Sequence, residues 1–161
     1  MAYSYLDTDV PTLGRLGMNG VQAIGNADFN PHFGVKLDVG YARSFDAFGS
    51  GHTADLLTYM GGPVFYPVRH RGLSIYMQAL AGGARETGVN SNNGAIVLGF
   101  VNKFAWSAGA GFQYRLTRSF SLRAGADYLR TSFFTPNLTV QGQNTVRSSV
   151  GFIYTFGGRR E

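Results

Sequence analysis

The chain has 161 residues, a net charge of +5 and charged side chains at 14% of positions, whereas ordinary soluble domains carry about 25%. Its length fits a single domain over residues 1–161, the absence of cysteine excludes a disulfide scaffold, and no apolar run reaches the roughly 18 residues of a membrane-spanning helix. Because so few charges cannot cover an ordinary soluble surface, the composition argues against a soluble enzyme.

Alternating apolar and polar residues predict eight β-strands along the chain. In chain order they cover residues 2–8, 18–29, 33–44, 53–66, 73–85, 102–116, 120–131 and 145–156. All but the first are long enough to cross a membrane as a tilted strand, for which about 9 to 11 residues suffice. The last strand shows the pattern most clearly, because Val150, Phe152 and Tyr154 alternate with small or polar residues and therefore share one face.

The connections between these strands alternate in length. Short connections cover residues 30–32, 67–72 and 117–119, whereas the long ones cover 10–17, 45–52, 86–101 and 132–144. Outer-membrane barrels have short periplasmic turns and longer extracellular loops. The pattern therefore predicts an all-β, eight-stranded antiparallel up-and-down transmembrane β-barrel with both termini in the periplasm. We expect the apolar stretch 95–101 to continue a strand above the membrane or to form a contact surface.

One face of the predicted strands is almost entirely apolar, with aromatic rings toward the strand ends. We expect this face to contact lipid, because membrane barrels carry aromatic girdles at both interfaces. Alternation alone leaves open the opposite arrangement, a soluble lipocalin-like carrier with the apolar set inside, but the low charge content favours lipid. The aromatic members of this face are Phe33, Tyr41, Tyr59, Phe65, Trp106, Phe112, Tyr114, Phe120, Tyr128, Phe152, Tyr154 and Phe156.

The other face carries small neutral residues and charges of both signs. The interior of an eight-stranded barrel is just wide enough for side chains to fill, and a buried charge without a partner is costly. We therefore expect a structural polar network that plugs the lumen, with a narrow pore or a conduit for small or hydrophobic solutes as the alternative. The expected members of the network are Asp28, Lys36, Asp38, Arg115, Arg123, Asp127 and Arg147.

Five segments carry a family resemblance: Tyr3-Ser4-Tyr5-Leu6, Asn30-Pro31-His32-Phe33-Gly34-Val35, Gly62-Pro63-Val64-Phe65, Ala126-Asp127-Tyr128-Leu129 and Gly151-Phe152-Ile153-Tyr154-Thr155-Phe156. They resemble the small barrels of the outer membrane protein A-like superfamily, and the resemblance covers nearly the whole chain. It implies an eight-stranded barrel inserted by the outer-membrane assembly machinery, which recognises a terminal aromatic strand such as the one ending at Phe156. It specifies no chemistry, and we expect no periplasmic peptidoglycan-binding domain after the barrel.

Candidate catalytic and metal-binding residues are sparse. His32, His52 and His70 lie in turns or loops without partners at metal-ligand spacing, so we expect no metal or other cofactor. Ser44, Asp46, Ser50 and His52, with Asp55 close by, supply residue types that an enzyme at the barrel rim needs, but no nucleophile motif surrounds them. We therefore expect no enzymatic activity but a structural, envelope-integrity or adhesion role through the extracellular loops and their protein partners.

Most of the positive charge is arginine, and its positions suggest anionic lipid partners. Arg43, Arg85 and Arg130 fall at the outer strand ends, where we expect contact with the phosphates of lipopolysaccharide. Further arginines, including Arg71 and Arg118, fall at the periplasmic edge, where phospholipid headgroups lie. We expect no nucleic-acid partner, because no basic stripe interleaves with exposed aromatics and no recognition motif is present.

Overall fold

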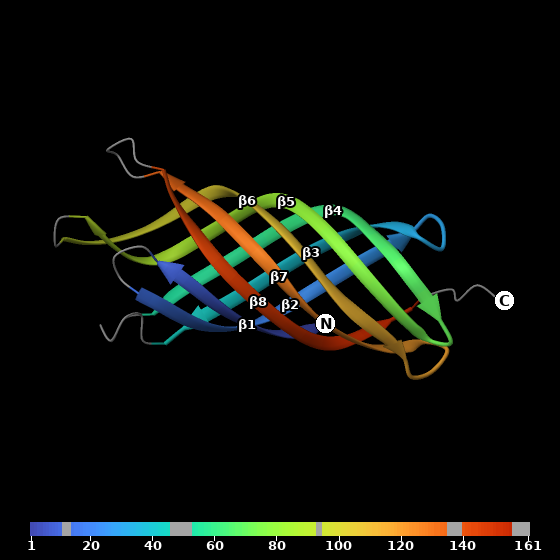
Figure 1. Cartoon of the computed structure of the whole chain (residues 1–161). Coiled ribbons are helices and arrows are strands. Elements are labelled where there is room, and N and C mark those ends of the chain that lie inside the picture. The colour runs from blue at the N-terminus through green and yellow to red at the C-terminus, as the bar shows by residue number, and fades with distance from the viewer. Residues whose placement is uncertain (11–13, 46–52, 93–94, 135–139, 156–161) are drawn as a thin grey trace.

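The computed structural model describes residues 1–10, 14–45, 53–92, 95–134 and 140–155, which form a closed antiparallel β-barrel (Figure 1). Each strand pairs with its neighbours in the chain, and β1 pairs with β8 to close the sheet. The predicted eight-stranded, antiparallel, up-and-down barrel is therefore confirmed. Its strands are β1 (Ala2–Val10), β2 (Gly14–Asp28), β3 (Phe33–Ser44), β4 (Ala54–His70), β5 (Leu73–Asn92), β6 (Ala95–Arg115), β7 (Phe120–Phe134) and β8 (Val140–Tyr154).

The two ends of the barrel differ. At one end, called the turn end here, β1 begins, β8 ends, and residues 29–32, 71–72 and 116–119 connect successive strands. At the other end, called the loop end, β1 meets β2, β3 meets β4, β5 meets β6 and β7 meets β8. Figure 1 shows the turn end on the right and the loop end on the left.

The turn end differs from the prediction at residues 67–72. β4 continues to His70, and only Arg71 and Gly72 connect it to β5. The pairing of β4 with β5 shifts its register around Pro67. Because proline lacks a backbone N–H, it interrupts a regular ladder but is accepted at a bulge, and the strand resumes beyond it. Arg71 and Gly72 have φ angles of 45° and 88°, which fit a tight two-residue hairpin turn.

At the loop end the strands are longer than the sequence pattern predicts. β5 and β6 pair without interruption up to Asn92 and Ala95, so most of the predicted loop 86–101 is a two-stranded ribbon. The expected continuation of a strand over residues 95–101 is confirmed. Gly, Asn and Ser break the apolar alternation over residues 86–92. The ladder continues there because cross-strand backbone hydrogen bonds do not depend on apolar side chains.

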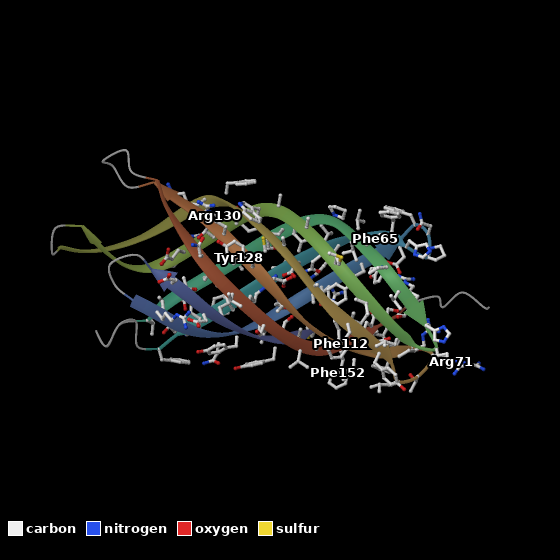
Figure 2. The ribbon with its side chains drawn as sticks, in the orientation of Figure 1. Phe65, Arg71, Phe112, Tyr128, Arg130 and Phe152 are labelled. Carbon is white, nitrogen blue, oxygen red and sulfur yellow. The ribbon has the colours of Figure 1, made fainter. Side chains whose placement is uncertain are left out.

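Side chains alternate between the inside and the outside of the barrel wall, and many of the apolar ones point outward (Figure 2). On β3, Val35, Leu37 and Val39 are 41 to 67% exposed, whereas the intervening Lys36 and Asp38 are 2% and 0% exposed. This distribution is the inverse of a lipocalin-like carrier, whose apolar set lies inside. No helix within the described ranges is long and apolar enough to cross a membrane.

Candidate functional site

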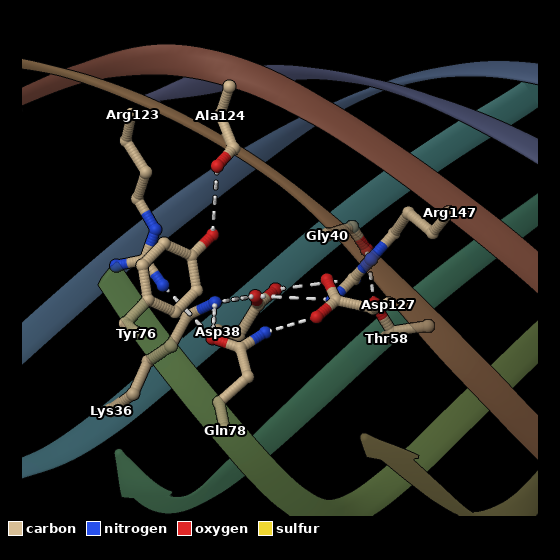
Figure 3. A network of polar contacts seen from close by, with 10 residues as sticks. All are labelled: Lys36, Asp38, Gly40, Thr58, Tyr76, Gln78, Arg123, Ala124, Asp127 and Arg147. Carbon is tan, nitrogen blue, oxygen red and sulfur yellow. Dashed lines mark hydrogen bonds and ion pairs between the residues drawn. The ribbon is translucent and has the colours of Figure 1, made fainter. Parts of the chain in front are cut away.

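The barrel interior holds a network of charged and amide side chains that joins several strands (Figure 3). Arg147 on β8 lies at its centre, and its Nη2 is 3.3 Å from a carboxylate oxygen of Asp38 on β3 and 3.1 Å from one of Asp127 on β7. All three residues occupy inward positions and are at most 4% exposed. On β2, the amide of Gln22 faces the same guanidinium, and with its oxygen toward Arg147 it accepts hydrogen bonds from Nη1 at 2.7 Å and from Nε at 3.0 Å.

Gln78 on β5 connects the remaining members of the network. Its Oε1 accepts hydrogen bonds from Lys36 Nζ and Arg123 Nη2, both at 3.0 Å. Its Nε2 donates to Asp127, and Lys36 Nζ lies 2.9 Å from Asp38 Oδ2. The contacts therefore run from β3 through β5 to β7 and β8, and they tie opposite sides of the barrel together.

The charges of this network do not balance. Three buried cations, Lys36, Arg123 and Arg147, face the two carboxylates. Burial of each ion costs several kcal/mol, which ion pairs and hydrogen bonds must offset. Arg123 is the excess cation: its guanidinium lies 3.7 Å from the centre of the Tyr76 ring, and its Nη1 has no hydrogen-bond partner among the described residues. A cation–π contact therefore takes the place of a carboxylate at Arg123.

Apolar layers fill the interior on both sides of the network. Toward the turn end, Val64 and Tyr66 pack with Tyr76. A cavity of about 10 Å³ beside Arg147 has room for about one water molecule. The network and the two apolar layers together place buried side chains across the middle of the barrel interior. The layer toward the loop end is larger and consists of Leu6, Leu16, Met18, Ala42, Ala54, Leu56, Met60, Leu80, Ala84, Ala105 and Leu129.

The structure places the predicted lumen residues in two groups. Lys36, Asp38, Arg123, Asp127 and Arg147 come together in the network. The other two lie exposed at the turn end, apart from the network, where Asp28 pairs with Arg69 at 2.6 Å and Arg115 ends β6. Both occupy inward positions by alternation, but the strands end there and the barrel wall no longer encloses them.

Sequence reasoning does not single out Gln22, Gln78 and Tyr76 as members of the network. All three occupy inward positions, which is the pattern in the sequence that could identify them. The large apolar layer toward the loop end is also unexpected, since alternation assigns the inner face to small and polar residues. Leucine at an inward position weakens the alternation that the prediction depends on.

Eleven of the twelve predicted outward aromatic residues lie on the outer surface with 37 to 59% exposure, and the twelfth, Phe156, lies outside the described residues. Toward the turn end, Phe33 contacts Phe65 and Phe120 contacts Tyr154, with ring centres 4.9 and 5.2 Å apart. Toward the loop end, the rings of Trp106 and Tyr128 are 5.9 Å apart. The remaining predicted members with outward exposure are Tyr41, Tyr59, Phe112, Tyr114 and Phe152.

The three arginines predicted at the outer strand ends have different surroundings. Arg43 donates to both carboxylate oxygens of Asp55, from Nε at 2.6 Å and from Nη2 at 2.9 Å. These hydrogen bonds lower the pKa of Asp55, and the ion pair neutralises the Arg43 charge. Arg85 and Arg130 are exposed, and Figure 2 shows Arg130 near Tyr128 on the outer side of the wall.

No described group of three or more His, Asp or Glu side chains is arranged to hold a metal ion. His32 and His70 are exposed in or beside turns, and His32 Nδ1 lies 3.0 Å from the backbone oxygen of Tyr66. Of the residues considered for a rim enzyme, Asp46, Ser50 and His52 lie outside the described residues.

Several proteins of known structure have a similar barrel fold. Neisserial surface protein A has a TM-score of 0.78 and 14% identity, with 96% of this chain and 94% of that chain covered. Ail, the attachment invasion locus protein of Yersinia pestis, has a TM-score of 0.65 and 19% identity over 96% and 94%. The N-terminal β-barrel domain of Pseudomonas aeruginosa OprF has a TM-score of 0.51 and 17% identity over 94% of each chain. No curated protein is significantly similar in sequence to this chain.

The sequence profile of the outer membrane protein β-barrel domain family matches residues 2–156, which is nearly the whole chain. In outer-membrane barrels the short turns face the periplasm, so the turn end is periplasmic and the loop end is extracellular. This chain therefore belongs to the outer membrane protein β-barrel domain family and is a bacterial outer-membrane β-barrel with both termini in the periplasm.

Proposed function

We propose that this protein is a non-enzymatic outer-membrane barrel that binds an extracellular partner through its β5–β6 ribbon, defined as residues 86–92 and 95–101. In this account the filled barrel is the anchor and the ribbon is the contact element. Outward aromatics contact lipid at both interfaces, and Arg85 and Arg130 contact lipopolysaccharide phosphates. Arg43 contributes less to lipopolysaccharide binding than Arg130, because Asp55 already neutralises its charge.

The length of the ribbon is the observation that carries this proposal. From the pair Ala81↔Trp106, at the aromatic girdle, the ladder continues without a register shift to the pair Asn92↔Ala95. At about 3.4 Å per residue this is roughly 37 Å along the strands, of which the ribbon from Glu86 to Asn92 makes up about 20 Å. A barrel needs no such extension to cross the membrane, because about 9 to 11 residues per strand suffice. The extension supports a role outside the membrane.

The ribbon also has open edges within the described part of the chain. β4 pairs with β5 only as far as Thr87, and β7 pairs with β6 only from Ala105. Unpaired backbone groups on such an edge can add a strand from another chain. The sequence of residues 95–101, Ala-Ile-Val-Leu-Gly-Phe-Val, has high β-propensity and no charge, which favours strand addition.

A relative with the same fold supports an adhesive role. Ail of Yersinia pestis is named for attachment and invasion, and one of its structures contains the heparin analogue sucrose octasulfate. The filled interior argues against the alternative, a pore or a conduit, because solutes need a continuous path through the lumen. The buried network around Arg147 and the larger apolar layer toward the loop end lie across that path.

A variant with a shortened ribbon tests the proposal. Replacement of residues 87–100 by Asn-Gly joins the paired residues Glu86 and Val101 through a two-residue hairpin turn. Bacteria that express the variant should adhere less to protein-coated surfaces than bacteria with the unchanged protein at equal surface amounts. The control shortens the β7–β8 hairpin between the paired residues Ser132 and Gly142. Full adherence of the ribbon variant, or an equal loss in the control, would contradict the proposal.

A further inference from the structure

Four arginines lie exposed at the turn end of the barrel: Arg69, Arg71, Arg115 and Arg118. The described carboxylate at this end is Asp28, and Arg69 pairs with it at 2.6 Å. The guanidinium of Arg69 also lies 3.8 Å from the Tyr66 ring centre. Within the described part of the chain, the other three arginines have no ion-pair partner. We call these three residues, Arg71, Arg115 and Arg118, the basic rim.

The basic rim occupies adjacent turns. Arg71 lies in the turn between β4 and β5, and the backbone N–H of Arg115 donates to the Gly72 oxygen of that turn at 2.8 Å. Arg118 lies in the next turn, between β6 and β7. Figure 2 shows Arg71 at the tip of the turn end, directed away from the barrel. The rim therefore gathers three positive charges on one side of the periplasmic mouth.

The rim lies at the depth of a lipid headgroup layer. Leu73, Tyr114 and Phe120 are 39 to 49% exposed and face outward at the ends of β5, β6 and β7. Arg71 and Arg118 are each two residues beyond one of them, or roughly 7 Å along an extended chain. The polar layer of a bilayer is about 5 to 8 Å thick on each side of the hydrocarbon core. Arg71 and Arg118 therefore lie within reach of that layer, and Arg115 lies beside them at the exposed end of β6.

The backbone of Arg71 gives an independent reason to look for a role of its side chain. Its φ of 45° is in the left-handed region, which Gly, Asn and Asp adopt far more readily than arginine. An Asn-Gly turn would fit the same conformation with less strain. The geometry of the turn therefore does not explain an arginine here, whereas a charge placed in the headgroup layer does.

We propose that the basic rim binds the phosphate groups of anionic phospholipids in the periplasmic leaflet of the outer membrane. The planar guanidinium forms paired hydrogen bonds with phosphate oxygens. Leucine, tyrosine and phenylalanine next to the rim anchor it at the membrane interface. Binding at this end holds the barrel at a fixed depth through contacts that the lumen and the ribbon do not supply.

Asymmetric vesicles test the proposal, because one leaflet can carry phosphatidylglycerol while the other carries only phosphatidylcholine. The protein and an Arg71→Asn/Arg115→Gln/Arg118→Gln variant are inserted, and protease accessibility of the ribbon establishes their orientation. The thermal unfolding midpoint is then compared between vesicles with and without phosphatidylglycerol in the leaflet at the turn end. Arg130→Gln is the matched control, since it removes an exposed arginine from the loop end.

We expect phosphatidylglycerol at the turn end to raise the midpoint of the unchanged protein and of Arg130→Gln, and to raise that of the triple variant by less than half as much. In phosphatidylcholine vesicles, Arg71→Asn alone should unfold at the same temperature as the unchanged protein or at a higher one, because asparagine relieves the backbone strain in the turn. An equal phosphatidylglycerol response in the triple variant overturns the proposal. If the triple variant also binds isolated peptidoglycan more weakly than the unchanged protein does, the partner of the basic rim is the cell wall and the proposal is overturned.

Discussion

At Arg147, one guanidinium serves two buried carboxylates, so the side chains of three strands depend on a single residue. Alternation along the strands predicts that Asp38, Asp127 and Arg147 point inward. It does not predict that they meet, because partners in a tilted barrel are set by strand register. Asp28 and Arg115 show the same limit, since their inward positions lie too close to the strand ends to be enclosed.

Removal of the central guanidinium should destabilise the barrel strongly. Arg147→Gln leaves Asp127 without its ion-pair partner, and we expect the free energy of unfolding to fall by about 3 to 5 kcal/mol. Urea unfolding of protein refolded in detergent micelles measures the difference. Arg115→Gln serves as the control, because that side chain is exposed and its change should stay within about 0.5 kcal/mol. Similar unfolding free energies for both variants would show that the network is not structural.

The Arg43–Asp55 pair, beyond the outward Tyr41 at the loop end, predicts a dependence on pH. Hydrogen bonds from Arg43 hold the pKa of Asp55 below its usual value of about 4. Such a carboxylate contributes stability above its unfolded-state pKa, and this contribution is lost as the pH falls through the lowered pKa. The thermal midpoint of Asp55→Asn should therefore fall less than that of the unchanged protein on acidification below about pH 4. Identical acid profiles for the two proteins would contradict this effect.

Among the strands, the sequence pattern predicts existence, direction and order well, because apolar alternation and turn residues are local properties. It predicts the strand ends less well. β4 continues past Pro67 because a bulge accommodates the proline, and the β5–β6 ribbon persists because each strand pairs with the other. Such pairing between segments is not visible in the sequence of either segment alone.

The close approach of neighbouring strands predicts which glycines cannot be replaced by a larger residue without loss of stability. A Cβ atom on Gly62 of β4 would overlap the backbone oxygen of Ala79 on β5, and a backbone atom cannot move aside as a side chain can. We expect Gly62→Val to lower the free energy of unfolding by about 1 to 3 kcal/mol. Gly25→Val is the matched control, since no atom lies within 4 Å of the added Cβ. Equal effects of the two substitutions on urea unfolding would contradict the close packing of β4 on β5.

For the molecule as a whole, the placement of apolar side chains on the outside fits lipid as the surrounding solvent. Aromatic and aliphatic residues cover the outside of the wall, while the charged network and two apolar layers lie inside. The fold and the polarity of the two faces follow from composition and alternation, whereas the family follows from the resemblance of short strand and turn segments. The larger apolar layer and the open edges of the ribbon follow from neither, because both depend on how eight strands meet in space.

Electrophoretic mobility with and without boiling tests most directly the central claim of a closed barrel with its apolar face in the membrane. Protein refolded into phospholipid vesicles is compared in SDS before and after heating, because a closed barrel resists SDS until it is heated. We predict a compact, faster band before heating that shifts to the position of the unfolded chain afterwards, and little folded protein in detergent-free buffer. A single band that does not respond to heating, together with full solubility in plain buffer, would contradict the account.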